Sequence, residues 1–100
     1  MSRIEVDTPE GAAVVLRACN PACARLDLLS VARAHRGQGK ARAALAAVAA
    51  VADARAMTVH LSVDTGFGSH RAGLIRLYRG AGFRYVAGSS GAMIRSPRTA

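Results

Sequence analysis

The stretch that decides the fold is residues 35–41, which read His35-Arg36-Gly37-Gln38-Gly39-Lys40-Ala41. An apolar run at residues 26–31 (LDLLSV) precedes it, and an alanine-rich run with helical spacing starts directly after it. The local order is therefore strand, glycine loop, helix. The first N–H groups of a helix have no partner within the helix, and the helix dipole is positive at that end. This loop therefore favours a phosphate group as its ligand.

The loop carries further features of an anion site. Arg36 and Lys40 add positive charge, while Gly37 and Gly39 allow a ligand to approach the backbone closely. The spacing is neither that of a Walker loop nor that of a Rossmann dinucleotide fingerprint. The residues thus predict a phosphate-bearing ligand without specifying which one.

The rest of the chain alternates between strand and helix patterns. Apolar residues three or four positions apart predict helices at residues 39–55 and 70–79, and Gly80 and Gly82 end the second one. Alternating or β-branched stretches predict strands at residues 4–6, 12–18, 25–31, 58–63, 83–86 and 92–94. The order β-β-β-α-β-α-β-β predicts an α/β (α+β) fold with two helices packed on one sheet, whose first three strands form an antiparallel meander.

Length and composition are typical of one compact domain, residues 1–100, with residues 96–100 expected as a loose tail. Apolar residues make up 51% of the chain, yet no apolar run approaches the roughly 20 residues that span a bilayer. The N-terminal residues lack the apolar centre of a signal peptide. We therefore expect a soluble, cytoplasmic protein with no membrane partner.

The charge is strongly positive, +8, from thirteen arginines and a single lysine against six acidic residues. Such a balance favours a polyanionic partner: nucleic acid, an acidic protein face or a phosphorylated cofactor. The arginines are spread along the chain rather than gathered in one block, and abundant arginine and alanine are also typical of a GC-rich genome. The charge alone therefore leaves the partner open.

The two cysteines, Cys19 and Cys23, flank a turn at Asn20 and Pro21. A structural metal site needs about four ligands, and no second Cys pair or His pair accompanies these two. A disulfide across the turn is the alternative, but a reducing cytoplasm disfavours it. We interpret the cysteines as small, half-buried residues beside a turn and predict no metal site.

A second cluster, near the end of the second predicted helix, refines the phosphate prediction. Leu77-Tyr78 followed by Gly82-Phe83 resembles the helix-end signature of the GNAT N-acetyltransferase superfamily. Either motif alone would be a weak signal. Their order along the chain, with a predicted strand between them, makes the resemblance specific.

The loop resembles the acetyl-CoA loop of the same superfamily. Arg36, Gly39 and Ala41 stand at the motif positions, and Val31 stands five residues before the arginine. The resemblance covers residues 25–86. The chain lacks the first strand of typical members and the two helices that follow it, and its short layout is similar to very small phage-encoded acetyltransferases.

The resemblance implies an enzyme that transfers an acetyl group from acetyl-CoA (coenzyme A) to an amine. It implies that the pyrophosphate lies on the amides of residues 37–41, that the pantetheine arm pairs with residues 29–31, and that an N–H near Val31 polarises the thioester carbonyl. The implied cofactor-binding residues are Leu29, Val31, Arg36, Gly37, Gln38, Gly39, Lys40, Ala41 and Arg71. The implied catalytic residue is Tyr78, a general acid that protonates the departing thiolate.

The chain departs from the family pattern at three positions that bear on the site. Arg71 stands where members often have asparagine, Leu74 where they often have a small residue, and Ser30 where some carry a glutamate base. The remaining candidates for a general base are Asp27, His35, His60, Asp64 and His70. An acceptor amine that arrives deprotonated needs no strong base, which is the alternative.

Three functions are left open by the sequence. The first is an N-acetyltransferase acting on an exposed protein lysine, including a phage anti-defence enzyme, because the missing helices normally wall the acceptor site. The second is a non-catalytic protein of GNAT fold whose basic surface binds nucleic acid or an acidic protein. The third is a small-molecule amine acetyltransferase that acts as a dimer. The expected oligomeric state is correspondingly a monomer or a homodimer.

Overall fold

The computed structural model describes residues 2–35, 38–63, 71–88 and 91–98. In chain order the elements are β1 (Ser2–Ile4), β2 (Ala12–Asn20), β3 (Cys23–Val31), a 3-10 turn η1 (Arg33–His35), α1 (Lys40–Ala54), β4 (Thr58–Ser62), α2 (Arg71–Gly80), β5 (Arg84–Tyr85) and β6 (Ala92–Arg95). The predicted α/β class and the predicted order of strands and helices are confirmed.

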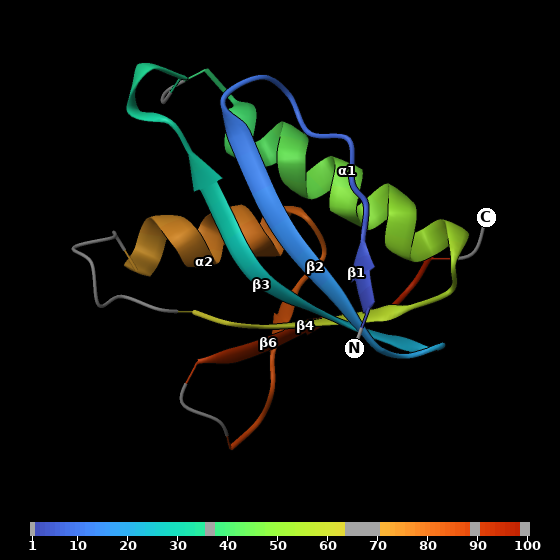
Figure 1. The fold of residues 1–100 in the computed structure, drawn as a ribbon. Helices are drawn as coiled ribbons and strands as arrows, with labels where there is room; N and C mark the ends of the chain where they lie inside the picture. Colours follow the sequence, from blue (N-terminus) through green and yellow to red (C-terminus); the bar gives the residue numbers. More distant parts are fainter. Residues whose placement is uncertain (1, 36–37, 64–70, 89–90, 99–100) are drawn as a thin grey trace.

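The six strands form one sheet in the order β1-β2-β3-β4-β6-β5 (Figure 1). The first three strands are an antiparallel meander, as predicted from their short connections. β4 pairs parallel to β3, because the chain returns through α1, and a parallel neighbour requires such a long crossover. β6 lies antiparallel between β4 and β5 and thereby completes a mixed sheet.

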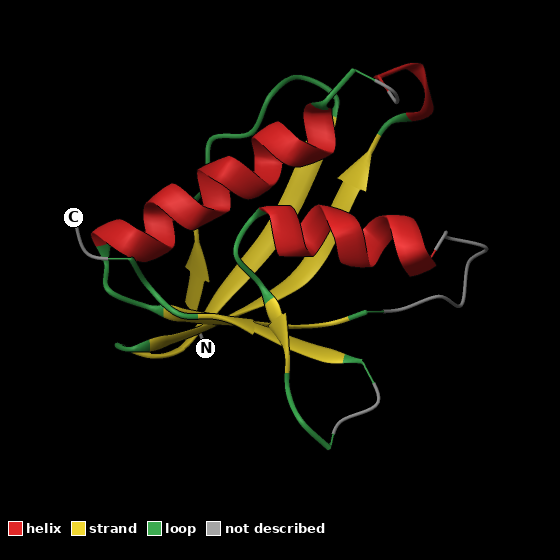
Figure 2. Ribbon diagram, turned by 180° about the vertical axis from the view of Figure 1, so that it is seen from behind, coloured by secondary structure: helices red, strands yellow, loops and turns green. Residues whose placement is uncertain are grey.

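Both helices lie on the same face of this sheet, as the view from behind shows (Figure 2). Beneath them lies the core, to which α1 contributes Ala44, Leu45, Val48 and Ala52. The largest fully buried side chains are Phe83, Leu16, Leu45, Met93, Val48 and Val59. None of the described helices covers the opposite face of the sheet, so the side chains on that face point towards solvent.

A β-bulge in β3 decides which residues of that strand face the helices. Asp27 is the extra residue, with no opposite partner on β2. Before it Leu26 is buried, and after it Leu28 is exposed while Leu29 and Val31 are half-buried. The bulge shifts the alternation of side chains by one residue. The last residues of β3 therefore present Leu29 and Val31 to the helical side of the sheet.

The first strand starts earlier than the sequence pattern predicts. It spans Ser2–Ile4 rather than residues 4–6, because Ile4 pairs with Leu16 and is buried there. Val6 lies beyond the strand but still packs against the core. Ile4 and Val6 therefore fit the alternating pattern of a strand, but Val6 is not part of the paired strand.

The 3-10 turn η1 was not predicted. Its backbone closes when the N–H of His35 donates to the carbonyl of Ala32 at 2.8 Å. The His35 ring packs on Gly11, which has a φ of +85°, and a Cβ at Gly11 would overlap the imidazole. A contact between residues this far apart in sequence leaves no local pattern, which is why the turn escaped prediction.

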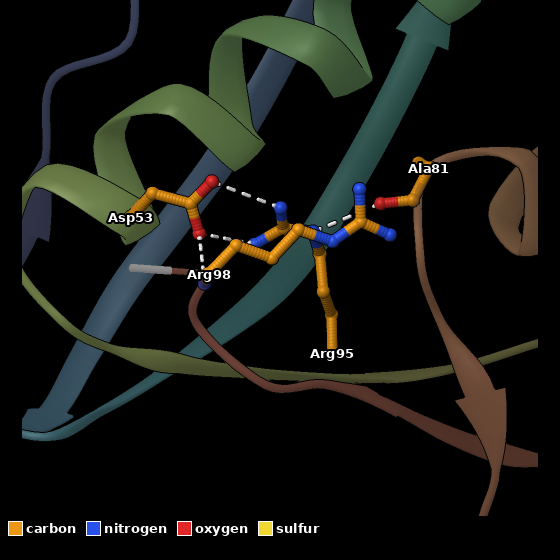
Figure 3. Close-up of polar contacts among 4 residues, drawn as sticks. All are labelled: Asp53, Ala81, Arg95 and Arg98. Atoms are coloured by element: carbon orange, nitrogen blue, oxygen red, sulfur yellow. Dashed lines mark hydrogen bonds and ion pairs between the residues drawn. The ribbon is translucent and has the colours of Figure 1, made fainter. Parts of the chain in front are cut away.

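A buried ion pair ties the end of α1 to β6 (Figure 3). The side chain of Arg95 is only 3% exposed and donates from Nη1 and Nη2 to the carboxylate of Asp53 at 2.8 and 3.0 Å. Its Nε donates to the carbonyl of Ala81 at 2.9 Å. The segment after β6, expected to be a loose tail, is held by the backbone N–H of Arg98, which donates to the same carboxylate at 2.8 Å. The hydrogen bonds from Arg95 and then Arg98 lower the pKa of Asp53 to about 2.

Cys19 and Cys23 are free thiols on either side of the β2–β3 turn. Cys23 is half-buried, but Cys19 is exposed, so the sequence interpretation holds for only one of them. Burial, followed by the hydrogen bond and the charge interaction with the Cys19 side chain, raises the pKa of Cys23. Among the described residues, no group of three or more His, Cys, Asp or Glu could hold a metal ion. Neither helix described has the length and apolar character that crossing a membrane requires.

Candidate functional site

The start of α1 is an open helix N-terminus. Gly39 stands at the N-cap with a φ of +73°, in the left-handed region that only glycine adopts without strain. No side chain of the described chain caps this end, and the first turn of the helix holds no acidic residue. Lys40 and Arg42 instead add positive charge to the positive end of the helix dipole. The sequence prediction that a glycine starts this helix is confirmed.

A cleft of about 340 Å³ opens at this N-terminus, between the end of β3, η1 and α2. Its lining residues are Val31, His35, Gly39, Lys40, Ala41, Arg42 and Leu77. We call it the α1 cleft. It combines apolar walls with two cations and no carboxylate among its described lining residues, which is the composition of a site for an anion with an apolar arm.

A second hollow of about 380 Å³ lies between α1 and α2 and shares Arg42 and Leu77 with the α1 cleft. The rest of its lining is Leu45, Ala46, Ala49, Arg76, Gly80 and Ala81. We call it the interhelix groove. Because the two hollows share these two walls, they adjoin each other, and together they extend from the end of β3 along both helices. We refer to the two together as the depression.

The edge of β3 beside the α1 cleft is not paired with β4. The parallel pairing runs from Cys23↔Thr58 to Arg25↔His60, and β3 then continues to Val31. Figure 1 shows the two strands diverging beyond this point. The half of β3 that carries Leu29 and Val31 therefore borders the depression rather than a neighbouring parallel strand.

Tyr78 lies on α2, directly after the cleft residue Leu77. It is half-buried, and its ring meets that of Phe83 edge-to-face at a centroid distance of 5.9 Å. Burial raises the pKa of Tyr78 above the usual 10, so the phenol holds its proton throughout the neutral range. Tyr78 is not among the described lining residues of the α1 cleft, whose wall on this helix is Leu77.

The structure brings together four of the residues expected to bind the cofactor. Val31, Gly39, Lys40 and Ala41 all line the α1 cleft. Leu29 lies nearby on β3 and packs against the core.

The remaining expected residues are not cleft residues of the described chain. Gln38 is exposed beside the N-cap and does not line the cleft. Arg36 and Gly37 lie outside the described residues. Arg71 is the first residue of α2, and its side chain lies outside the described part of the molecule.

Three of the five candidate bases, Asp27, His35 and His60, lie in the described residues. Only His35 lines the α1 cleft. Asp27 and His60 are not cleft residues. The carboxylate of Asp27 forms ion pairs with Arg17 and Arg25 at 3.2 and 3.1 Å. Asp64 and His70 lie outside the described residues.

Arg42 and Leu77 were not named as cofactor residues from the sequence. Arg42 lies on the first turn of α1, next to Ala41, and Leu77 belongs to the motif that drew attention to Tyr78. Leu77 lies one residue before Tyr78 and therefore faces another side of α2. That this side faces α1 is a tertiary fact with no signature in the sequence.

Solved structures that share this fold include the following three. The anti-CRISPR protein AcrVA5 is 18% identical, with a TM-score of 0.73 over 95% of this chain and 97% of that one. The ribosomal-protein-S18-alanine N-acetyltransferase from Escherichia coli is 22% identical, with a TM-score of 0.70 over 90% and 63%. An acetyltransferase of the GNAT family from Staphylococcus aureus Mu50 is 15% identical, with a TM-score of 0.68 over 88% and 60%. This chain thus spans less than two thirds of the length of the two bacterial enzymes.

No curated protein matches the sequence significantly. The model of the acetyltransferase (GNAT) family, however, matches residues 8–83, which is well over half of the chain and includes both the glycine loop and the Leu77-Tyr78 motif. The structural neighbours carry the same fold. The chain belongs to the GNAT acetyltransferase family.

Proposed function

We propose that this protein is an acetyl-CoA-dependent N-acetyltransferase. The observation that carries the proposal is the α1 cleft, an uncapped, glycine-started helix N-terminus with Lys40 and Arg42 beside it. Membership of the GNAT family supports the same cosubstrate, since its members generally use acetyl-CoA. Acetyl-CoA is large, with an anionic pyrophosphate and an apolar arm, and the two adjoining hollows of the depression offer room and chemistry for both.

The pyrophosphate binds at the start of α1. Its oxygens accept hydrogen bonds from the backbone N–H groups at Lys40 and Ala41, with the positive helix end and Arg42 adding attraction. A hydrogen bond to a charged group contributes about 1.5–3 kcal/mol, so a few of them account for micromolar binding. The nucleoside end continues into the interhelix groove, where Arg76 supplies further positive charge.

The pantetheine arm lies along the edge of β3 opposite β2, near Leu29. This half of β3 has no parallel neighbour among the described strands, because the pairing with β4 ends at Arg25. The bulge at Asp27 supports the arrangement, since it directs Leu29 and Val31 to the helical side where the arm would run. Val31 contributes a wall of the α1 cleft.

The reaction is direct attack of an acceptor amine on the thioester carbonyl. A C–N bond forms, the C–S bond breaks, and the phenol of Tyr78 donates its proton to the departing thiolate. Burial keeps that phenol protonated at neutral pH, as an acid in this role must be. The acceptor enters as the free amine and gives up its surplus proton to solvent, so the chemistry requires no strong base in the cleft.

The acceptor is an amine on a protein. The similar enzyme from E. coli is named for the alanine of a ribosomal protein, an acceptor carried by a macromolecule. This chain is shorter than that enzyme, and AcrVA5 has nearly the same length.

Substitution of Ala41 tests the binding half of the proposal. Ala41→Glu places a carboxylate in the α1 cleft, where it repels the pyrophosphate, yet an acidic residue in the first turn of a helix stabilises the helix. We expect acetyl-CoA affinity, measured by isothermal titration calorimetry, to fall at least tenfold. Ala43→Glu is the matched control, because Ala43 is exposed on the same turn and is not a cleft residue. Equal losses in the two variants, or no binding of millimolar acetyl-CoA by the wild type, would contradict the proposal.

Substitution of Tyr78 tests the chemical half. Tyr78→Phe keeps the edge-to-face contact with Phe83 and removes only the acid. Loss of a general acid lowers turnover by roughly 100-fold, while acetyl-CoA affinity should change less than twofold. Release of the CoA thiol, followed with a lysine-containing peptide as acceptor, measures turnover. Unchanged turnover with intact binding would rule out the role of Tyr78 and leave the binding proposal standing.

A further inference from the structure

The face of the sheet opposite the helices carries a row of basic side chains. Strand registers align Arg3 with Arg17, Arg17 with Arg25, and Arg25 with His60. The same line continues from His60 to Ile94 and from Ile94 to Arg84. One residue from each of the six strands therefore stands in a single transverse line, and four of the six are arginines. We call this line the arginine row.

All members of the arginine row point away from the helices. Each alternates along its strand with buried residues such as Ile4, Leu16, Ala24 and Val59, and neighbours along a strand face opposite sides of the sheet. The four arginines and His60 are exposed; the side chains of Arg17 and Arg25 are 50% and 55% exposed. The two described helices lie on the other face in both views of the fold.

This arrangement opposes folding unless a counter-charge is supplied. Like charges directly opposite on neighbouring strands destabilise a sheet. Asp27, the bulge residue, is the only acidic residue in the described strands, and its carboxylate meets Arg17 and Arg25 at 3.2 and 3.1 Å. In the described chain neither Arg3 nor Arg84 forms an ion pair. The row thus retains unneutralised charge at both ends of the sheet.

We propose that the arginine row binds the phosphodiester backbone of a nucleic acid. Neighbouring strands lie about 4.8 Å apart, so the five intervals between six strands extend over about 24 Å across the twisted sheet, a length that several consecutive phosphates of a nucleic acid also cover. Guanidinium groups bind phosphate oxygens bidentately. The row includes no aromatic side chain for base stacking, so recognition is through the backbone and independent of sequence.

The same observations favour nucleic acid over an acidic protein. Protein interfaces draw their energy from buried aromatic and aliphatic anchors, whereas the row offers one isoleucine among its charges. Its arginines lie on three neighbouring strands and on the far edge strand, so the charge extends from one edge of the sheet to the other. An acidic protein face would need carboxylates spread over the same length, while a nucleic acid carries its charges along that length by its covalent structure.

Fluorescence anisotropy tests the proposal with the full chain and a labelled 20-nucleotide DNA of mixed sequence, as a single strand, as a duplex and as the corresponding RNA. Affinity should fall between 50 and 300 mM KCl with a log–log slope of roughly −3, as four phosphate contacts imply. Arg3→Gln/Arg84→Gln should weaken binding at least tenfold at 50 mM KCl and reduce the slope by about two. The control Arg55→Gln/Arg76→Gln removes the same charge from the helical side, and it should lower the affinity for the nucleic acid less than threefold.

Three results would overturn the proposal. The first is an equal loss of affinity for the nucleic acid in the two double variants. The second is displacement of the nucleic acid by 1 mM acetyl-CoA. The third is tighter binding of a labelled 20-residue polyglutamate than of every nucleic acid at the same salt concentration. The last result would assign the row to an acidic protein. Calorimetry of acetyl-CoA with Arg3→Gln/Arg84→Gln separates this test from the proposed function, because the row lies on the face away from the α1 cleft. Comparison of the three nucleic acid forms identifies the preferred one.

Discussion

At the residue scale, the backbone conformation and the neighbours of Gly82 explain why this position of the family motif is glycine. Its φ is +98°, a conformation that strains any residue with a Cβ. A Cβ there would also lie 3.2 Å from Nε of Arg95 and 2.9 Å from Nη2 of Arg98. Because Arg95 is fixed by its ion pair with Asp53, it cannot withdraw. The glycine is required both by the end of α2 and by the buried guanidinium beside it.

We therefore expect Gly82→Ala to lower the free energy of unfolding by about 2 kcal/mol, because it combines backbone strain with close contact. Gly80→Ala is the matched control, since Gly80 ends α2 with open space around it and no positive φ. There the alanine should stabilise the protein by about 0.5–1 kcal/mol. Urea unfolding of both variants measures the difference. Loss of stability at Gly80 equal to that at Gly82 would contradict this account.

At the scale of elements, the Asp53–Arg95 pair joins the last turn of α1 to β6 and, through Ala81, to the end of α2. Nothing local in the sequence indicated it, since the two residues lie far apart along the chain. Arg95 occupies a buried strand position where the alternation predicts an apolar side chain. A buried guanidinium persists there because the carboxylate of Asp53 and the carbonyl of Ala81 satisfy its donors.

Removal of the carboxylate tests this connection. Asp53→Asn leaves the buried guanidinium without its counter-charge, and we expect a loss of about 3 kcal/mol in the free energy of unfolding at pH 7. The pKa of Asp53 is lowered from 3.8 to about 2 in the folded protein. The stabilisation by the ionised carboxylate of Asp53 is therefore complete above pH 4 and disappears as the pH falls through 2. Urea titrations at pH 7, 4 and 2 should show the difference between wild type and Asp53→Asn shrinking only at the lowest pH.

The elements themselves were largely predictable, but their irregularities were not. Helical spacing and the absence of internal breakers defined α1, and alternation defined β4, because both patterns are local. The bulge at Asp27 depends on pairing with β2, and the turn at η1 depends on the contact between His35 and Gly11. The turn η1 lines the α1 cleft through His35, and the bulge sets the side of the sheet that the cleft residue Val31 faces. The part of the site that local patterns missed is therefore the part shaped by non-local contacts.

For the whole molecule, the net charge of +8 and the arginine row make folding sensitive to ionic strength. We expect the melting temperature to rise between 10 and 300 mM KCl, because salt screens repulsion between exposed cations. Arg3→Gln/Arg84→Gln should show a smaller rise, since two of the repelling charges are gone. Differential scanning calorimetry measures both. A melting temperature independent of salt in the wild type would contradict the strain we assign to the row.

The sequence alone determined the order of elements, the glycine at the start of α1 and the family resemblance carried by the loop and by Leu77-Tyr78. Each of these depends on neighbours along the chain: periodicity, backbone freedom, and the charge of adjacent residues. Only the tertiary structure decided that Leu77 closes the α1 cleft and that Asp53 neutralises Arg95. It also decided that arginines scattered from β1 to β5 stand in one line on the open face of the sheet. The reason is that strand register and helix placement join residues remote in sequence, and neither composition nor local pattern records which of them will meet. The glycine loop therefore predicted a phosphate ligand on one side of the sheet, while the arginine row on the other side became visible only once the strands were paired.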